Sequence, residues 1–299
     1  MIHIPVLLEE VLEGLNLHEG DTVLDGTING GGHAEEVAKR IGKRGVLIGL
    51  DRDKEALARA RTRLENVPCK VALHEADFRN LDRALKEDGS TCVNAILLDL
   101  GLSSDQLETS GRGFSFQKDE PLLMTFTATP HENDLSAREI LNTWEEENIR
   151  DILHGYGEEK FARAIARTIV SLREEHPFER TTDLVNAVER AVPAWYRHAR
   201  IHPATKTFQA LRIVVNDEIE GLSEGLTKAY ENICIGGRIA VVSFHSIEDR
   251  TVKRFFRKLA SEEKGTVLTK KPMRPTAKEI HDNPRARSAR LRIFEKHNP

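Results

Sequence analysis

The fold is decided by the stretch TVLDGTINGGGH, residues 22–33, in which a short apolar run passes directly into a cluster of glycines. A short apolar run bounded by turn residues is typical of a buried strand, and the residues after the glycines favour a helix. The alternation continues with a helix predicted at 54–64 and strands at 45–51, 70–77 and 93–100. Nearly continuous apolar strands separated by helices predict a parallel α/β sheet covered on both faces.

A long gap interrupts this sheet. More than 130 residues separate the fourth predicted strand from the next one, RIAVVSF at 238–244. A strand-to-strand crossover needs only a dozen or so residues, so the gap must hold a separate unit. Its sequence is helical, with a capping-box pattern at Ser136 and Glu139 and apolar residues at helical spacing: Phe161, Ile165, Ile169 and Leu172. We predict a helical insertion, a helix at 208–232 that returns the chain to the sheet, and a last, edge-side strand at 290–296.

The composition indicates a cytoplasmic globular protein. Of the 299 residues 39% are hydrophobic and 31% are charged, and no apolar run approaches the ~18 residues of a membrane helix. The amino terminus lacks the basic and apolar segments of a signal peptide. The cysteines Cys69, Cys92 and Cys234 are odd in number, far apart in the sequence and without metal-ligand spacing. We therefore expect a reducing compartment, no metal site and no membrane association.

The charge is unevenly distributed along the chain. The net charge is -4, but residues 250–299 carry 15 Lys and Arg against 5 Asp and Glu, a balance of +10, so the preceding residues carry -14. A basic end on an acidic body is typical of a phosphate-binding surface. A solvated basic tail has the same composition, and charge alone leaves both interpretations open.

The glycine cluster indicates a ligand site. In an open α/β sheet, ligands bind at the carboxyl ends of the strands, and glycines there let the backbone approach a ligand closely. The dinucleotide pattern G-x-G-x-x-G does not fit, because its third glycine position falls on Glu35. This disfavours an NAD site, and a plain tight turn remains the simplest alternative for the glycines.

Polar or aromatic residues follow the other strands. Asp51 ends the second strand, where a carboxylate can accept hydrogen bonds from ribose hydroxyls, a group that NAD and S-adenosylmethionine share. Phe78 follows the third strand and is placed to pack on an adenine, although a lone phenylalanine is more often a core residue. Asp99 ends the fourth strand after a run of apolar residues, where burying a carboxylate is costly unless it has a function.

Segments along the whole chain resemble the RsmH (MraW) family of methyltransferases. They occur in collinear order: His3-x-Pro5-Val-Leu-Leu8, Thr27-x-x-x-Gly31-Gly32-His33, DLGLSSDQ at 99–106, RGFSF at 112–116, YGEE at 156–159, HPATKTFQALR at 202–212, SFHSIEDR at 243–250 and NPRARS at 283–288. The resemblance implies a class I (Rossmann-like) methyltransferase sheet with an inserted all-helical substrate-binding domain. Its parts would be residues 1–111, the insertion 112–211, and residues 212–299 with the basic carboxy-terminal segment.

The resemblance also implies an activity. The family uses S-adenosylmethionine to methylate N4 of a cytidine, position 1402, in 16S ribosomal RNA, and we expect this RNA as the partner within the 30S subunit. Cofactor contacts carried over by position are Gly31, Gly32, His33, Asp51, Phe78, Asp99 and Gln106. Asp99 and Ser103 are candidate catalytic residues. Candidates for RNA contact or for organising the pocket are His202, Lys206, Arg212, His245 and Arg250. Arg212 and Arg250 also have ordinary ion-pair partners nearby in sequence, Glu218 and Asp249.

Two departures from the family pattern bear on function. Asn29 stands where the family has glycine, and asparagine tolerates a positive φ better than most residues. Leu123 and Thr125 replace an acid and a base in the family's P-L-D-M-R-M segment, which looks like the removal of a matched pair. This favours a rival in which the protein is a non-catalytic RNA-binding or ribosome-assembly factor. A second rival, an NAD-dependent oxidoreductase, lacks an obvious hydride-transfer site.

The carboxy-terminal arginines are the expected phosphate contacts. Arg285, Arg287, Arg290 and Arg292 lie within eight residues on the basic segment. We predict that they bind the RNA backbone while the acidic body repels RNA that does not fit.

Overall fold

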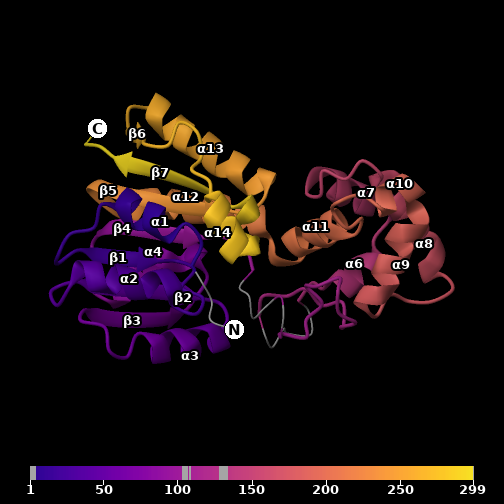
Figure 1. The fold of residues 1–299 in the computed structure, drawn as a ribbon, viewed down its shortest axis with the longest axis horizontal. Helices are drawn as coiled ribbons and strands as arrows, with labels where there is room; N and C mark the ends of the chain where they lie inside the picture. The colour runs from indigo at the N-terminus through magenta and orange to yellow at the C-terminus, as the bar shows by residue number, and fades with distance from the viewer. Residues whose placement is uncertain (1–4, 103–106, 108, 128–133, 299) are drawn as a thin grey trace. The chain divides into compact units, whose positions relative to one another are not determined.

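A computed structural model describes residues 5–102, 107, 109–127 and 134–298. The chain forms two compact units, drawn in Figure 1. The sheet unit comprises Met1–Gly101 and Ile219–Pro299, and the helical unit comprises Leu102–Glu218. The predicted insertion, 112–211, lies wholly within the helical unit, which begins ten residues earlier and ends seven later.

The sheet has seven strands in the order β3-β2-β1-β4-β5-β7-β6. They are β1 (Thr22–Asp25), β2 (Val46–Asp51), β3 (Lys70–Glu75), β4 (Val93–Asp99), β5 (Ile233–Ser243), β6 (Gly265–Val267) and β7 (Arg290–Lys296). The first five pair in parallel, and β7 runs antiparallel to both β5 and β6. The predicted α/β sheet is confirmed. The last predicted strand is not at the edge, because the three-residue β6, too short to show in the sequence, covers it.

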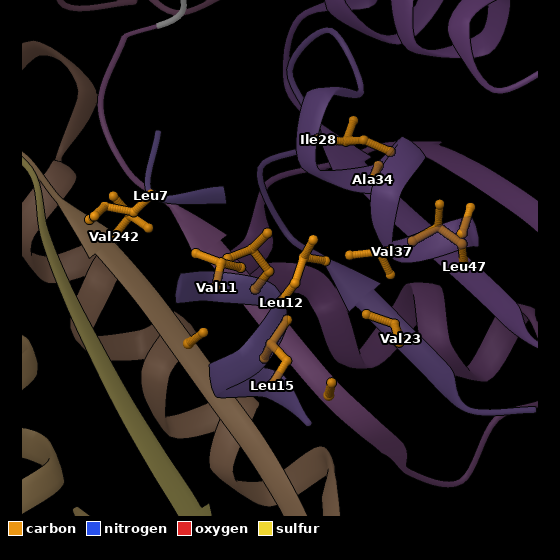
Figure 2. Packing of buried hydrophobic residues seen from close by; sticks show 14 of the residues in the cluster. Leu7, Val11, Leu12, Leu15, Val23, Ile28, Ala34, Val37, Leu47 and Val242 are labelled. Atoms are coloured by element: carbon orange, nitrogen blue, oxygen red, sulfur yellow. The ribbon is translucent and has the colours of Figure 1, made fainter. Parts of the chain in front are cut away.

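Helices cover both faces of this sheet (Figure 1). They are α1 (Leu8–Leu15), α2 (Gly32–Ile41), α3 (Lys54–Arg63), α4 (Leu81–Glu87), α12 (Glu218–Asn232), α13 (Ser246–Ser261) and α14 (Ala277–Asp282), with the 3-10 turns η1 (Phe78–Asn80) and η2 (Pro284–Ser288). Side chains alternate across each strand, so β1 sends Val23 to one core and Leu24 to the other. Figure 2 shows the first core, where Val11 and Leu15 of α1 lie over the strands with Val37 of α2.

The predicted helix at 208–232 is wrong as one element. The structure has α11 (Thr205–Asn216) and α12, separated by Asp217 in a left-handed conformation with φ 50°. A left-handed residue cannot continue an α-helix, and aspartate and asparagine adopt this conformation at less cost than most residues. The apolar periodicity runs through the break, which is why the sequence pattern did not reveal it.

The helical unit has a core of its own. Its helices are α6 (Ala137–Thr143), α7 (Glu146–Gly155), α8 (Ala162–Arg173), α9 (Thr181–Ala191), α10 (Ala194–Arg197) and α11. Ser136 caps α6 by accepting a hydrogen bond from the Glu139 backbone N–H at 3.2 Å, as the sequence predicts. Ile165 and Ile169 of α8 are fully buried in a cluster whose members all belong to this unit. An independent core is the physical requirement for a separate folding unit.

Two of the three cysteines are joined. Cys92, just before β4, forms a disulfide with Cys234 in β5, and only Cys69 is free. The expectation of a reducing compartment, in which the cysteines would stay reduced, is therefore wrong for two of the three. The two positions are 142 residues apart in the sequence, but β4 and β5 are neighbours and pair Val93 with Ile233, which brings the two thiols together. Within the described ranges, no helix has the length and apolar character needed to cross a membrane.

Candidate cofactor site at the strand tips

The strand order reverses between β1 and β4, and their carboxyl ends meet there. Ligands bind at such a switch point because the loops that leave the strands diverge. The loop after β1 bridges the two strands: Gly26 donates its N–H to the Leu97 carbonyl at 2.9 Å, and Thr27 Oγ1 accepts the Asp99 N–H at 2.6 Å. Each of β1, β2 and β4 ends in an aspartate at this edge, namely Asp25, Asp51 and Asp99.

The glycine loop carries two residues with positive φ. Asn29 has φ 48° and Gly31 has φ 77°, so the expectation that Asn29 fits a left-handed position is confirmed. The Asn29 side chain donates from Nδ2 to the Thr27 carbonyl at 2.9 Å, which helps hold the turn. A Cβ at Gly31 would lie 3.4 Å from Ala60 Cα in addition to being strained by the φ angle. Gly31 caps α2, whose first residues are Gly32 and His33.

Asp51 is held by the backbone on both oxygens. Asn29 donates its N–H to Oδ2 and Asp53 donates its N–H to Oδ1, each at 2.9 Å. Burial nevertheless raises the pKa of Asp51 to about 6, more than these hydrogen bonds lower it. A carboxylate has about four acceptor sites, so two remain for hydroxyl groups of a ligand.

Asp99 and His33 form the buried centre of the site. Both side chains are buried, and His33 Nδ1 lies 3.5 Å from Asp99 Oδ2. The other ring nitrogen, Nε2, lies 2.9 Å from the Val6 carbonyl, which can only accept, so Nε2 carries a proton. Burial raises the pKa of Asp99 well above its ordinary value, and the charges of Asp25 and Glu248 raise it further. No described residue donates a hydrogen bond to Asp99 Oδ1, which is itself buried.

Asp25 is a site residue that sequence reasoning missed. It is 2% exposed at the end of β1, and its Oδ1 accepts the Thr27 N–H at 3.1 Å. Burial raises its pKa to about 7, and the neighbouring charge of Asp51 adds to the shift. The signal was present in the sequence, because Asp25 ends its strand as Asp51 and Asp99 end theirs. Buried carboxylates that repel one another favour a cationic ligand.

The position of Phe78 is compatible with both of its interpretations, a contact with adenine and a core residue. It lies in η1 after β3, and its ring packs on α12, where a Cβ at Gly225 would be 2.3 Å from ring carbon Cδ2. The ring is also half-exposed. It is therefore anchored as a core residue while part of its surface remains available to a ligand. Ser103 and Gln106 lie outside the described residues.

The three candidate RNA contacts in the helical unit each interact with another residue of that unit. His202 stacks on Phe116, with ring centroids 4.4 Å apart and planes 9° apart. Lys206 Nζ donates to the Glu158 carbonyl at 2.7 Å. Arg212 makes a bidentate pair with Glu218, both bonds 2.8 Å, so the ordinary ion-pair interpretation is confirmed for this residue. These contacts give all three residues a structural role.

The candidates of the sheet unit lie on α13. His245 is the N-cap residue of that helix, and its Nδ1 accepts the Glu248 N–H at 3.3 Å. Arg250 is exposed on the same helix. Its proposed partner Asp249 is bound by Arg292, with Nε to Oδ1 at 2.6 Å.

The prediction for the carboxy-terminal arginines is wrong for Arg292, which is buried, and Arg290 also lies beside a carboxylate of the protein. Arg292 is 4% exposed in its ion pair with Asp249, and Arg290 Nη1 lies 3.5 Å from the same carboxylate. These residues join β7 to α13, because burying a guanidinium requires a partner for its charge. Arg285 and Arg287, on η2, are exposed.

The segment that departs from the family pattern is held by its main chain. Arg112 is buried and donates from Nη1 to the carbonyls of Thr125, at 3.1 Å, and Phe126. Asn216 donates to the Met124 carbonyl at 2.8 Å and accepts the Phe126 N–H at 2.7 Å. Thr125 is buried and its hydroxyl bonds the Thr127 carbonyl. No sequence pattern predicted these hydrogen bonds of Asn216.

Reversed strand order, a glycine loop and aspartates at the tips of adjacent strands define an α/β protein of the class I methyltransferase type. Sequence comparison is more specific. The chain belongs to the MraW methylase family, whose model matches residues 1–297, and S-adenosylmethionine is the cofactor of this family.

Individual relatives extend over nearly the full chain. Ribosomal RNA small subunit methyltransferase H of Synechococcus elongatus is 44% identical over 294 residues, covering 98% of this chain and 94% of its own. The protein of the same name from Carboxydothermus hydrogenoformans is 43% identical, covering 98% and 97%. Among solved structures, an rRNA methylase from Streptococcus thermophilus is 11% identical, with a TM-score of 0.44 and coverage of 98% and 93%.

Proposed function

We propose that this protein transfers a methyl group from S-adenosylmethionine to the N4 amine of cytidine 1402 in 16S ribosomal RNA, within the 30S subunit and in the cytoplasm. Family membership and relatives named for small-subunit rRNA methylation support the reaction class and the RNA. The observation that carries the proposal is the buried Oδ1 of Asp99, which has no donor among the described residues and lies at the switch point of the sheet.

The strand tips fit the cofactor. S-adenosylmethionine carries ribose hydroxyls, an adenine and a positively charged sulfonium, and when bound it supplies an activated methyl group. Asp51 has acceptor capacity left for the hydroxyls, and Phe78 offers part of an aromatic ring to the adenine. Gly31 and Gly32, at the start of α2, allow close approach of the backbone. Asp25 and Asp99 would supply negative charge to the sulfonium, because a neighbouring cation favours the ionised form of a carboxyl group.

The residues around Asp99 suit proton handling at an amine. The N4 amine of cytosine is a weak nucleophile because its lone pair is delocalised, so alignment and a hydrogen-bond acceptor are the main requirements. We assign Asp99 as that acceptor, positioned by His33, with Ser103 as a second candidate beyond the described residues. A bound sulfonium cation would favour the ionised form of Asp99, and a carboxylate with a raised pKa is then suited to take up the proton that the amine releases after methyl transfer.

The non-catalytic rival has one observation in its favour. Leu123 and Thr125 bring neither an acid nor a base to their segment, and buried Thr125 binds only main chain among the described residues. Since Arg112 and Asn216 hold this segment through its backbone, a structural role there is independent of those side chains. The NAD rival is weaker, because Glu35 stands at the third glycine position and is paired with Arg63 at 2.6 Å.

The deciding experiment is methyl transfer to ribosomal particles. The protein is incubated with labelled S-adenosylmethionine and 30S subunits that lack the modification, and the product nucleoside is identified. We expect N4-methylcytidine at one position, with much slower methylation of a short naked oligonucleotide of the same sequence. Cofactor binding without methylation of any RNA would replace this proposal with the non-catalytic rival.

We further propose that the helical insertion serves the RNA and is dispensable for the cofactor. Its core is independent, and the proposed cofactor residues within the described ranges all lie in the sheet unit. Residues 112–211 would be replaced by a short linker and affinity for S-adenosylmethionine measured by calorimetry. Unchanged affinity with loss of RNA binding supports this division of roles. Loss of cofactor binding by a folded sheet unit contradicts it.

A further inference from the structure

The helical unit carries an exposed aromatic cluster. Phe161, Trp195 and Tyr196 lie edge to face, with ring centroids 4.9 to 5.9 Å apart. Lys160 places its ammonium 4.2 Å from the centroid of the Trp195 ring and 4.8 Å from that of Tyr196. Trp195 is nevertheless 63% exposed. Its ring is therefore held by its neighbours while most of its surface stays in solvent, and tryptophan is enriched among the residues that dominate binding energy at interfaces.

A buried carboxylate holds the cluster in place. Glu159 is fully buried, and its Oε2 accepts the Tyr196 hydroxyl at 2.6 Å while Oε1 accepts the Phe161 N–H at 2.9 Å. The same loop is fixed on its other side by Lys206, which binds the Glu158 carbonyl. The rings are therefore ordered before any ligand arrives, which lowers the entropy that binding would cost.

The chain around Trp195 is basic. Between Glu189 and Asp217 there is no acidic residue, while five lysines and arginines occur there. Arg197 and Arg200 are exposed, and no ion pair is found for either within the parts of the chain that the structure describes. Cations beside an exposed aromatic face match one nucleotide of a single strand, which offers a base to stack and a phosphate to pair. An acidic protein partner would form ion pairs with the cations, but its carboxylates would not stack on the indole.

We propose that Trp195 is a stacking platform for an unpaired base of the RNA, with Lys160, Arg197 and Arg200 facing the adjoining phosphates. The substrate class rests on the proposed function, but the platform is distinct from the strand-tip site. In this proposal the platform adds affinity beyond that contributed by the methylated base. Stacking on an indole tolerates any base.

Intrinsic fluorescence tests the contact directly. The chain has two tryptophans, so Trp144→Phe leaves Trp195 as the sole reporter. The probes are a single-stranded eight-nucleotide oligouridylate and an RNA duplex of equal length. We expect the single strand to quench Trp195 much more than the duplex does, and no quenching in Trp195→Phe, which retains Trp144. An oligouridylate that binds by anisotropy without quenching Trp195 overturns the proposal. Equal quenching by polyglutamate does so too, and indicates a protein partner.

Affinity provides the second test. Trp195→Ala should weaken oligouridylate binding about 10-fold, and Trp195→Phe should recover most of the loss. Ile235→Ala is the matched control, because Ile235 is also 63% exposed but lies on β5 of the sheet unit. Equal affinities in Trp195→Ala and the wild type contradict the proposal. The full chain with 30S particles separates the two claims: methylation without Trp195 quenching removes only the platform, and quenching without methylation removes only the proposed function.

Discussion

Asp99 of the sheet unit and Glu159 of the helical unit are both buried carboxylates, yet their surroundings differ completely. Both oxygens of Glu159 accept hydrogen bonds from within the unit, from the Tyr196 hydroxyl and the Phe161 N–H. Asp99 Oδ1 has no donor among the described residues, and its other oxygen faces His33 at 3.5 Å. Hydrogen bonds within the fold offset the free energy of burying Glu159. No such hydrogen bond from a described residue offsets the burial of Asp99 Oδ1, which leaves this oxygen available to a ligand.

The same contrast extends to other buried polar residues of the two units. In the helical unit, buried Asn216 and Arg112 satisfy main-chain groups of one segment. At the strand tips, burial raises the pKa of Asp25 to about 7 and that of Asp51 to about 6, and the charge of Asp51 adds to the shift of Asp25. Buried polar groups that are fully partnered stabilise a fold, and those left with unused capacity mark where it binds something.

Asp99→Asn should give the largest effect. The amide keeps the shape of the side chain and cannot acquire a charge that is costly to bury, so the protein should fold at least as stably as the wild type. Without the carboxylate, methyl transfer to 30S particles should fall about 100-fold or more. Labelled methyl incorporation and thermal unfolding measure the two quantities. A variant that turns over like the wild type would remove Asp99 from the chemistry.

Asp51→Ala should lower cofactor affinity about 10- to 100-fold, because each hydrogen bond from a hydroxyl to a carboxylate contributes about 1.5–3 kcal/mol. Calorimetry with S-adenosylmethionine measures it. The control is Asp53→Asn, since Asp53 is the neighbouring acid and caps α3 through the Glu55 N–H, a role that asparagine can fill. If both variants bind equally well, Asp51 does not contact the cofactor.

The pH dependence of cofactor binding should show an effect of up to about 10-fold. The raised pKa values of Asp25 and Asp51 mean that these groups stabilise the free protein fully below pH 3.8, and that this contribution is lost as the pH rises through 6 to 7. A cationic ligand prefers the ionised form, so affinity for S-adenosylmethionine should rise from pH 5.5 to 8. The demethylated product, whose thioether sulfur carries no charge, should show a flatter profile. Identical profiles for the two ligands would argue against a role for charge.

Glu159→Gln should have the smallest effect at the cofactor site, less than about twofold in affinity. It replaces two charge-assisted hydrogen bonds by weaker ones, so the free energy of unfolding should fall by about 1–3 kcal/mol. Chemical denaturation and calorimetry on the same sample measure both. A large loss of cofactor affinity in a folded variant would contradict the purely structural role that we assign to Glu159.

Much of the sheet unit could be predicted from the sequence. The first four strands show as apolar runs, and the polar residues that end them converge because parallel strands share an edge. The helical character of the insertion follows from the spacing of residues such as Ile165 and Ile169. Asp51 and Asp99 could be identified from position alone, and Asn29 from its tolerance of a positive φ.

What the sequence could not show depends on contacts across the chain. Asp217 breaks a continuous apolar period, and the pairing of Cys92 with Cys234 follows only from the order of β4 and β5. In the sequence Arg292 belongs to a basic segment, and only the position of β7 in the sheet shows that it pairs with Asp249. The sequence likewise cannot show that Asp99 Oδ1 lacks a hydrogen-bond donor among the described residues, because this depends on where the surrounding groups lie in space.

The placement of β7 also sets an order on folding during synthesis. β7 lies between β5 and β6 and pairs with both, so the sheet cannot complete its hydrogen bonding until residue 296 has been made. The helical unit is contiguous, and its buried core runs from Phe114 to Leu211. Because domains fold as units while the chain emerges from the ribosome, this inserted unit can close its core first. Of the strands translated before it, β4 then remains without its partner β5 until residue 243 has been made, and β5 in turn lacks β7 until residue 296 has been made.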